Sequence, residues 1–90
     1  MGARLVITGR VQGVFYRDWA VTTARALGVT GWVRNRADGS VEAQAEGPDA
    51  AVAAFVAACH AGPERAQVDG VETRAVADEG AAGFARRATA

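Results

Sequence analysis

Residues 9–17 of this 90-residue chain have the sequence GRVQGVFYR, and their types and spacing are the ones best suited to a binding or catalytic site. The segment contains two glycines, follows a short apolar run and precedes an amphipathic stretch that ends at Leu27. It is therefore predicted to be a loop between a strand and a helix. Such a loop directs backbone N–H groups and a helix N-terminus at one point, which attracts phosphate and other anions. Arg17, where the helix begins, can add a guanidinium.

The residue types that are missing exclude several other kinds of site. All ten cationic side chains are arginine, which excludes both a Walker-type phosphate loop and Schiff-base chemistry, because each needs a lysine. Ser40, Cys59 and His60 are each the single copy of their residue type. Cys59 and His60 are neighbours on a predicted helix, where their side chains diverge, so a paired nucleophile and base are not expected. One cysteine allows no internal disulfide and no cysteine-rich metal site.

Length, charge and hydropathy set the broad class of the protein. Ninety residues, half of them apolar, predict a single domain over residues 1–90 with a modest core. A formal net charge of zero argues against attraction of the whole molecule to nucleic acid or to a membrane. The apolar runs are shorter than a bilayer, and the N-terminus lacks a signal-peptide apolar region. We therefore expect a cytoplasmic protein without a nucleic-acid partner or a membrane partner.

Hydrophobic periodicity and turn residues predict the element order β-α-β-β-α-β. Gly28 is a natural helix cap, and Asp38-Gly39 between two strand patterns indicates a hairpin. Two helices then cover one face of an antiparallel sheet, which is a ferredoxin-like α+β sandwich with its other face open to solvent. The predicted strands span residues 3–10, 29–37, 40–47 and 68–77, with a weak terminal strand at 83–89. The first predicted helix spans residues 16–27, and the second starts at Pro48-Asp49 and is ended by Gly62-Pro63.

Alternation along the strands predicts which side chains face the helices. Val33 should face them, and so should Asn35, two residues further along the same strand. The first two strands flank the first helix, so we expect Asn35 to approach the loop at the start of that helix. The solvent-facing side would carry Arg36, Arg34, a half-exposed Trp32 and the outward residues of the third strand, namely Glu42, Gln44 and Glu46.

The loop GRVQGVFYR resembles the signature loop of the acylphosphatase family, and GWVRN at residues 31–35, followed by Asp38-Gly39, resembles that family's second motif. The similarity extends over nearly the whole chain. It implies a monomer that hydrolyses an acyl phosphate, a small molecule, to a carboxylate and inorganic phosphate without a cofactor, a metal or a phosphoenzyme. By motif position, Asn35 would orient the attacking water. The phosphate would be held by the Arg17 side chain and by the backbone amides of Gln12, Gly13, Val14, Phe15, Tyr16 and Arg17.

The end of the chain departs from the family pattern. Relatives usually place an apolar residue two positions after the phenylalanine that corresponds to Phe84, and this chain has Arg86 there. The departure predicts either a frayed last strand or an Arg86 side chain whose stem packs along the surface. Arg86 and Arg87 together are expected to form a solvated tail.

Two other functions compete with the enzyme. Domains of this kind also occur within larger hydrogenase maturation proteins that handle carbamoyl phosphate, so a non-catalytic phosphate- or carbamoyl-phosphate-binding module is the alternative. The start at Met1 and the lack of a linker favour a free-standing protein. An RNA-binding sheet would need aromatic residues on its open face, where the third strand instead presents carboxylates.

Overall fold

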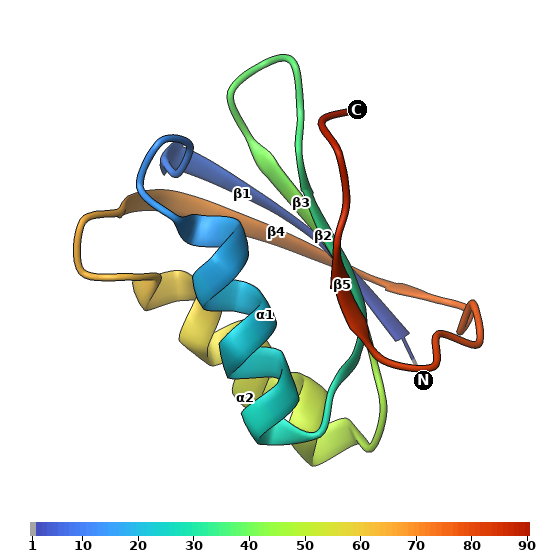
Figure 1. Ribbon diagram of the computed structural model, residues 1–90. Coiled ribbons are helices and arrows are strands. Elements are labelled where there is room, and N and C mark those ends of the chain that lie inside the picture. The colour runs from blue at the N-terminus through green and yellow to red at the C-terminus, as the bar shows by residue number, and fades with distance from the viewer. Residues whose placement is uncertain (1) are drawn as a thin grey trace.

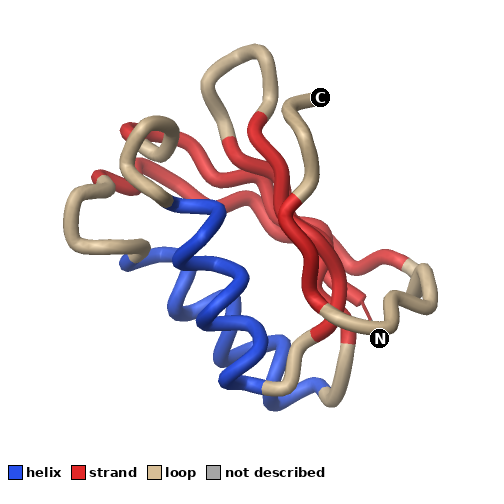
Figure 2. Tube along the Cα trace, viewed as in Figure 1, coloured by secondary structure: helices blue, strands red, loops and turns tan. Residues whose placement is uncertain are grey.

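A computed structural model describes residues 2–90 and has the predicted element order. Within this range, five strands form one sheet in the order β4-β1-β3-β2-β5, and both helices pack against the same face (Figure 1 and Figure 2). The ferredoxin-like architecture is thus confirmed. The elements are β1 (Gly2–Arg10), α1 (Tyr16–Leu27), β2 (Thr30–Asn35), β3 (Val41–Glu46), α2 (Asp49–Ala61), β4 (Gln67–Val76) and β5 (Phe84–Arg86).

The sheet is mixed, whereas the sequence predicts an antiparallel one. The strands β4, β1, β3 and β2 pair antiparallel, but β5 runs parallel to β2. The reason lies in the connection over residues 77–83, which carries the chain from β4 at one edge of the sheet to β5 at the other (Figure 1). This connection returns the chain in the direction of β2, with Phe84 opposite Gly31.

The last strand is short, but the segment after it is not frayed. The Arg87 N–H group donates to the Val33 carbonyl at 2.8 Å, and the Ala90 N–H group donates to the Asn35 carbonyl at 2.9 Å. The chain end therefore follows β2 to its last residue, and the C-terminus lies beside the β2–β3 hairpin (Figure 1).

The hydrophobic core lies between the sheet and the helices. Leu5 and Ile7 of β1 are fully buried, as the alternation predicts, and Phe55 of α2 packs 5.5 Å from Phe84 of β5 between ring centroids. Cys59, also fully buried, lies on the same face of α2, and burial raises the pKa of its thiol to about 12. Neither helix of the described chain is long and apolar enough to cross a bilayer.

The prediction that the other sheet face is open to solvent is wrong at its centre. Trp32 is only 3% exposed rather than half-exposed, because basic side chains cover its indole. Cation–π contacts of this kind stabilise an aromatic ring that the helices cannot reach. The guanidinium carbons that lie 4.6–4.9 Å from the ring centroid belong to Arg4, Arg34 and Arg87.

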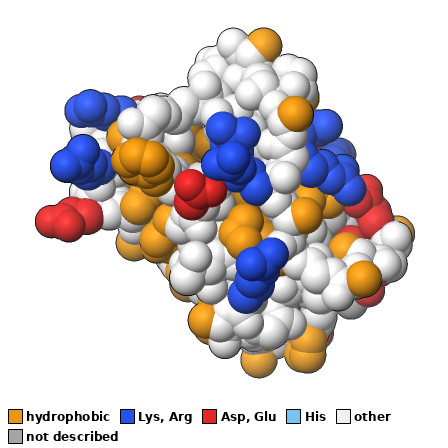
Figure 3. Space-filling view, in the orientation of Figure 1, with side chains coloured by type: hydrophobic (Ala, Val, Ile, Leu, Met, Phe, Trp, Pro, Cys, Tyr) orange, Lys and Arg blue, Asp and Glu red, His pale blue; other side chains and the backbone are white. Residues whose placement is uncertain are grey.

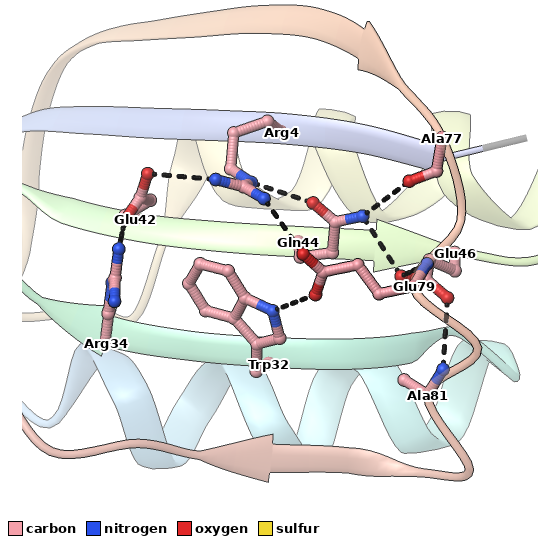
Figure 4. A network of polar contacts seen from close by, with 9 residues as sticks. All are labelled: Arg4, Trp32, Arg34, Glu42, Gln44, Glu46, Ala77, Glu79 and Ala81. Carbon is pink, nitrogen blue, oxygen red and sulfur yellow. Dashed lines mark hydrogen bonds and ion pairs between the residues drawn. The ribbon is translucent and has the colours of Figure 1, made fainter.

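The third strand's polar side chains, Glu42, Gln44 and Glu46, are also buried rather than outward in solvent. Glu42 lies between two guanidinium groups, 3.4 Å from Arg4 and 2.6 Å from Arg34 (Figure 4). Glu46 accepts a hydrogen bond of 2.8 Å from the Glu79 backbone N–H group. The connection between β4 and β5 thus folds over the end of β3, which strand periodicity alone does not predict.

The Glu42 cluster makes stability depend on pH. Burial raises the pKa of Glu42, but the hydrogen bonds and charges of Arg34 and Arg4 together outweigh it, so this pKa lies below its ordinary value of 4.5. A carboxylate with a lowered pKa contributes fully to stability above its unfolded-state pKa, and the contribution is lost as pH falls through the folded-state value.

We therefore predict that the free energy of unfolding, measured by urea titration, declines below about pH 4.5. The decline should be smaller in a Glu42→Gln variant, which has no carboxylate to protonate at that position. The same decline in both proteins would show that Glu42 does not contribute to it.

Candidate functional site

The predicted anion loop connects β1 to α1 and has a strained backbone. Gly13 and Phe15 have φ values of 73° and 61°, in the left-handed region, and no other non-glycine residue among those described has a positive φ. A left-handed non-glycine residue costs about 1–3 kcal/mol and is typical of binding sites. Phe15 is the N-cap of α1, and its side chain makes no capping hydrogen bond. The first N–H groups of α1 thus lack a side-chain cap and can receive an anion.

The loop, the start of α1, the end of β2 and β5 surround a pocket of about 240 Å³. Arg17 and Asn35, which the sequence predicts to act together, both line it. Asn35 reaches the pocket because it is the last residue of β2, on the strand face that also carries the buried Val33. The full lining is Val11, Gly13, Phe15, Tyr16, Arg17, Asp18, Asn35 and Arg86.

Two residues of the predicted phosphate loop, Gln12 and Val14, are not among the residues that line the pocket. Val14 is buried in the core. The Gln12 amide nitrogen donates to the backbone carbonyls of Arg36 at 2.8 Å and Ser40 at 2.9 Å. The Gln12 side chain therefore joins the loop to the β2–β3 hairpin and fixes the distance between the loop and the end of β2.

The hairpin that receives Gln12 is longer than the predicted two-residue turn. It spans residues 36–40, because β2 ends at Asn35 and β3 begins at Val41. Asp38 closes it by accepting hydrogen bonds from the Ser40 hydroxyl at 2.6 Å and the Ser40 N–H group at 3.0 Å. These bonds hold the pKa of Asp38 below its usual range.

The two aromatic residues of the loop differ in their surroundings. Phe15 is 72% exposed, at the rim of the pocket. Tyr16 is buried, and its hydroxyl donates to the Cys59 carbonyl of α2 at 2.8 Å. Burial raises the pKa of Tyr16 above its ordinary value, so the phenol stays neutral and links the two helices.

The Arg17 guanidinium is oriented by the chain end. Its Nη1 donates to the Arg87 carbonyl at 3.2 Å, and the Arg87 N–H group is itself bonded to β2. The expectation of a solvated tail at Arg86 and Arg87 is thus wrong, because both residues make specific contacts although they are exposed.

Asp18 and Arg86 are pocket residues that the sequence analysis does not predict. Arg86 Nη1 lies 2.9 Å from Asp18 Oδ1. Basic side chains lie next to an acidic one on the face that presents β5 and the start of α1 (Figure 3). The sequence does contain a signal for Arg86, because it follows the buried Phe84 by two residues and so shares the helix-facing side of the strand with it. Within residues 2–90 no cluster of three or more His, Cys, Asp or Glu side chains is arranged to hold a metal ion.

Comparison with known proteins gives consistent matches. A family model described as Acylphosphatase matches residues 3–86. An acylphosphatase of Rhodospirillum rubrum is 53% identical over 90% of this chain and 89% of its own length. The crystal structure of acylphosphatase from Bacillus subtilis matches with a TM-score of 0.92 and 36% identity, over 96% of this chain and 97% of that one. A full-length HypF in its phosphate- and nucleotide-bound form matches with a TM-score of 0.81 and 25% identity, over 12% of that chain.

Removing the Gln12 hydrogen bonds should lower the stability of the fold by a measurable amount. A Gln12→Leu variant removes two hydrogen bonds and leaves two carbonyl groups without this partner, so the free energy of unfolding should fall by about 1–3 kcal/mol. Gln67→Leu, at an exposed position of β4, is the matched control and should change stability by no more than about 0.5 kcal/mol. Equal stability of the two variants in urea titrations would show that Gln12 does not hold the loop.

Proposed function

The chain belongs to the acylphosphatase family and is an enzyme that hydrolyses the carboxyl–phosphate bond of acyl phosphates, and we propose that the pocket at the start of α1 is its active site. In this proposal the backbone amides of residues 12–17 and the Arg17 side chain hold the phosphoryl group. Asn35 orients the water that attacks it. The observation that carries the proposal is the shared pocket, in which Arg17 of α1 and Asn35 of β2 meet at the loop.

The chemistry of the substrate suits this set of groups. An acyl phosphate has a weakly basic carboxylate as its leaving group, so little protonation of that group is needed. Phosphoryl transfer then depends on in-line placement of the nucleophile and on stabilisation of the equatorial oxygens. Backbone N–H groups and the planar fork of Arg17 match those oxygens. The uncapped start of α1 adds the positive end of the helix dipole.

The Asn35 carboxamide is suited to hold a water molecule, because it offers one acceptor oxygen and one donor nitrogen. Its backbone is held on both sides. It pairs with Val41 of β3, and its carbonyl accepts the Ala90 N–H group. A fixed backbone limits the positions of the short side chain, which supports a role in orientation rather than in proton transfer.

The alternative, a binding module of a larger maturation protein, has less support. The match to full-length HypF covers 12% of that chain, whereas the match to the acylphosphatase of R. rubrum covers 89% of its length. A small acyl phosphate as substrate follows from the family. The expectations of a single domain, a monomer and a cytoplasmic location stay predictions.

The role of Asn35 predicts a loss of turnover without a comparable loss of phosphate binding. For Asn35→Ala we expect kcat for benzoyl phosphate to fall by about two to four powers of ten, as for the loss of other positioning groups. Inhibition by inorganic phosphate should change by no more than about threefold, because the loop and Arg17 remain in place. Turnover equal to that of the parent protein would remove Asn35 from the mechanism.

The role of Arg17 predicts a loss of phosphate and substrate binding. Arg17→Lys keeps the charge but loses the planar fork, so the inhibition constant for phosphate and the KM for benzoyl phosphate should each rise by about ten- to a hundredfold. Arg65→Lys, at an exposed position outside the pocket, is the matched control. If phosphate inhibits Arg17→Lys as well as it inhibits the parent protein, Arg17 does not clamp the phosphoryl group.

A further inference from the structure

A carboxylate lines the pocket that is proposed to hold a phosphate. Asp18 follows Arg17 directly, in the first turn of α1, and both residues line the pocket. A negative charge favours the N-terminus of a helix but repels a second anion bound there. Without compensation, Asp18 would therefore weaken the binding of a dianionic phosphoryl group.

The compensating charge is on the neighbouring strand. Arg86 of β5 lines the same pocket, and its Nη1 lies 2.9 Å from Asp18 Oδ1. Arg86 is held in place because it pairs with Val33 of β2, and the next residue, Arg87, donates its N–H group to the Val33 carbonyl. The strand pairing thus fixes the backbone position from which the guanidinium reaches Asp18.

The Asp18–Arg86 ion pair contributes little to the stability of the fold. The two side chains are 52% and 59% exposed, and exposed ion pairs contribute little to folding. Their charges nevertheless act on any ion in the pocket, because the screening length is about 10 Å at 0.1 M salt. The pair therefore has more effect on a bound anion than on the stability of the fold.

We propose that Arg86 sets the phosphate affinity of the pocket by cancelling the charge of Asp18. This inference rests on the proposed active site and adds to it a specificity-determining residue. Arg86 neutralises the Asp18 carboxylate. The positive potential that Arg17 and the loop amides create at the phosphate is then not reduced by Asp18.

The test is a double-mutant cycle with phosphate affinity measured by calorimetry, which does not depend on turnover. Arg86→Gln leaves Asp18 unpaired and should weaken phosphate binding by about three- to tenfold. Asp18→Asn leaves Arg86 unpaired and should tighten binding by about two- to fivefold. The double variant has the net pocket charge of the parent protein and should bind phosphate within about twofold of it. At 1 M salt the differences should shrink, because the screening length falls to about 3 Å.

Two further variants control for charge and for folding. Arg86→Lys keeps the charge and should bind phosphate within about twofold of the parent protein. Arg74→Gln removes the same charge from β4, at the opposite edge of the sheet, and should leave phosphate affinity unchanged. If Arg86→Gln fails to fold, the tighter binding expected of Asp18→Asn still tests the proposal.

Several results would overturn the inference. One is a shift of phosphate affinity in the same direction for Arg86→Gln and Asp18→Asn. Another is a double variant that binds phosphate as weakly as Arg86→Gln. A third is a fall in kcat in Asp18→Asn with unchanged phosphate affinity, which would give Asp18 a role in turnover rather than in binding. Failure of the proposed function is distinguishable. A parent protein that shows the predicted affinities but does not hydrolyse benzoyl phosphate supports the charge pair and contradicts the assignment of the active site. If the parent protein hydrolyses benzoyl phosphate and the variants bind phosphate as tightly as the parent, the role of the Asp18–Arg86 pair is contradicted and the active-site assignment is not.

Discussion

The site depends on the docking of the chain end along β2. The pairing of β5 with β2 holds it, together with further backbone hydrogen bonds from Gly31 N–H to the Gly83 carbonyl, from Arg87 N–H to the Val33 carbonyl, and from Ala90 N–H to the Asn35 carbonyl. Because β5 is parallel to β2, this docking carries the chain toward the loop at the start of α1. It places the Arg87 carbonyl against Arg17 and the Arg86 guanidinium against Asp18. It also covers Trp32 with the Arg87 side chain.

A second constraint is the side chain of Gln12. Gln12 ties the loop to the β2–β3 hairpin through two carbonyl groups, so the loop and the end of β2 cannot move apart without breaking both bonds. The loop's own backbone is strained at Phe15, and packing around Val14 and Tyr16 offsets that cost. Contacts outside the pocket thus hold its lining residues in place, and the proposed electrostatic stabilisation of a phosphoryl group requires such preorganisation.

The sequence predicts the parts of the site that depend on local pattern. The glycines of the loop, the helix that begins at Tyr16 and the alternation from Val33 to Asn35 are all visible in the chain, and they lead to the observed pocket. The parts that it does not predict depend on contacts between distant segments. Trp32 is buried because arginines from three segments of the chain meet over it, and Glu46 is buried because residues 77–83 fold back over β3. Strand alternation assigns a residue to a face but cannot predict what covers that face.

In the proposed active site, the loop amides and Arg17 hold the phosphate while the Asn35 carboxamide faces it. The most direct measurement is a titration of the ¹⁵N-labelled protein with inorganic phosphate, followed by amide NMR shifts. We expect saturable shifts at the backbone amides of residues 12–17 and at the Asn35 side-chain amide, with one common affinity. Saturation elsewhere on the molecule, with the signals of the loop and of Asn35 unmoved, would contradict it.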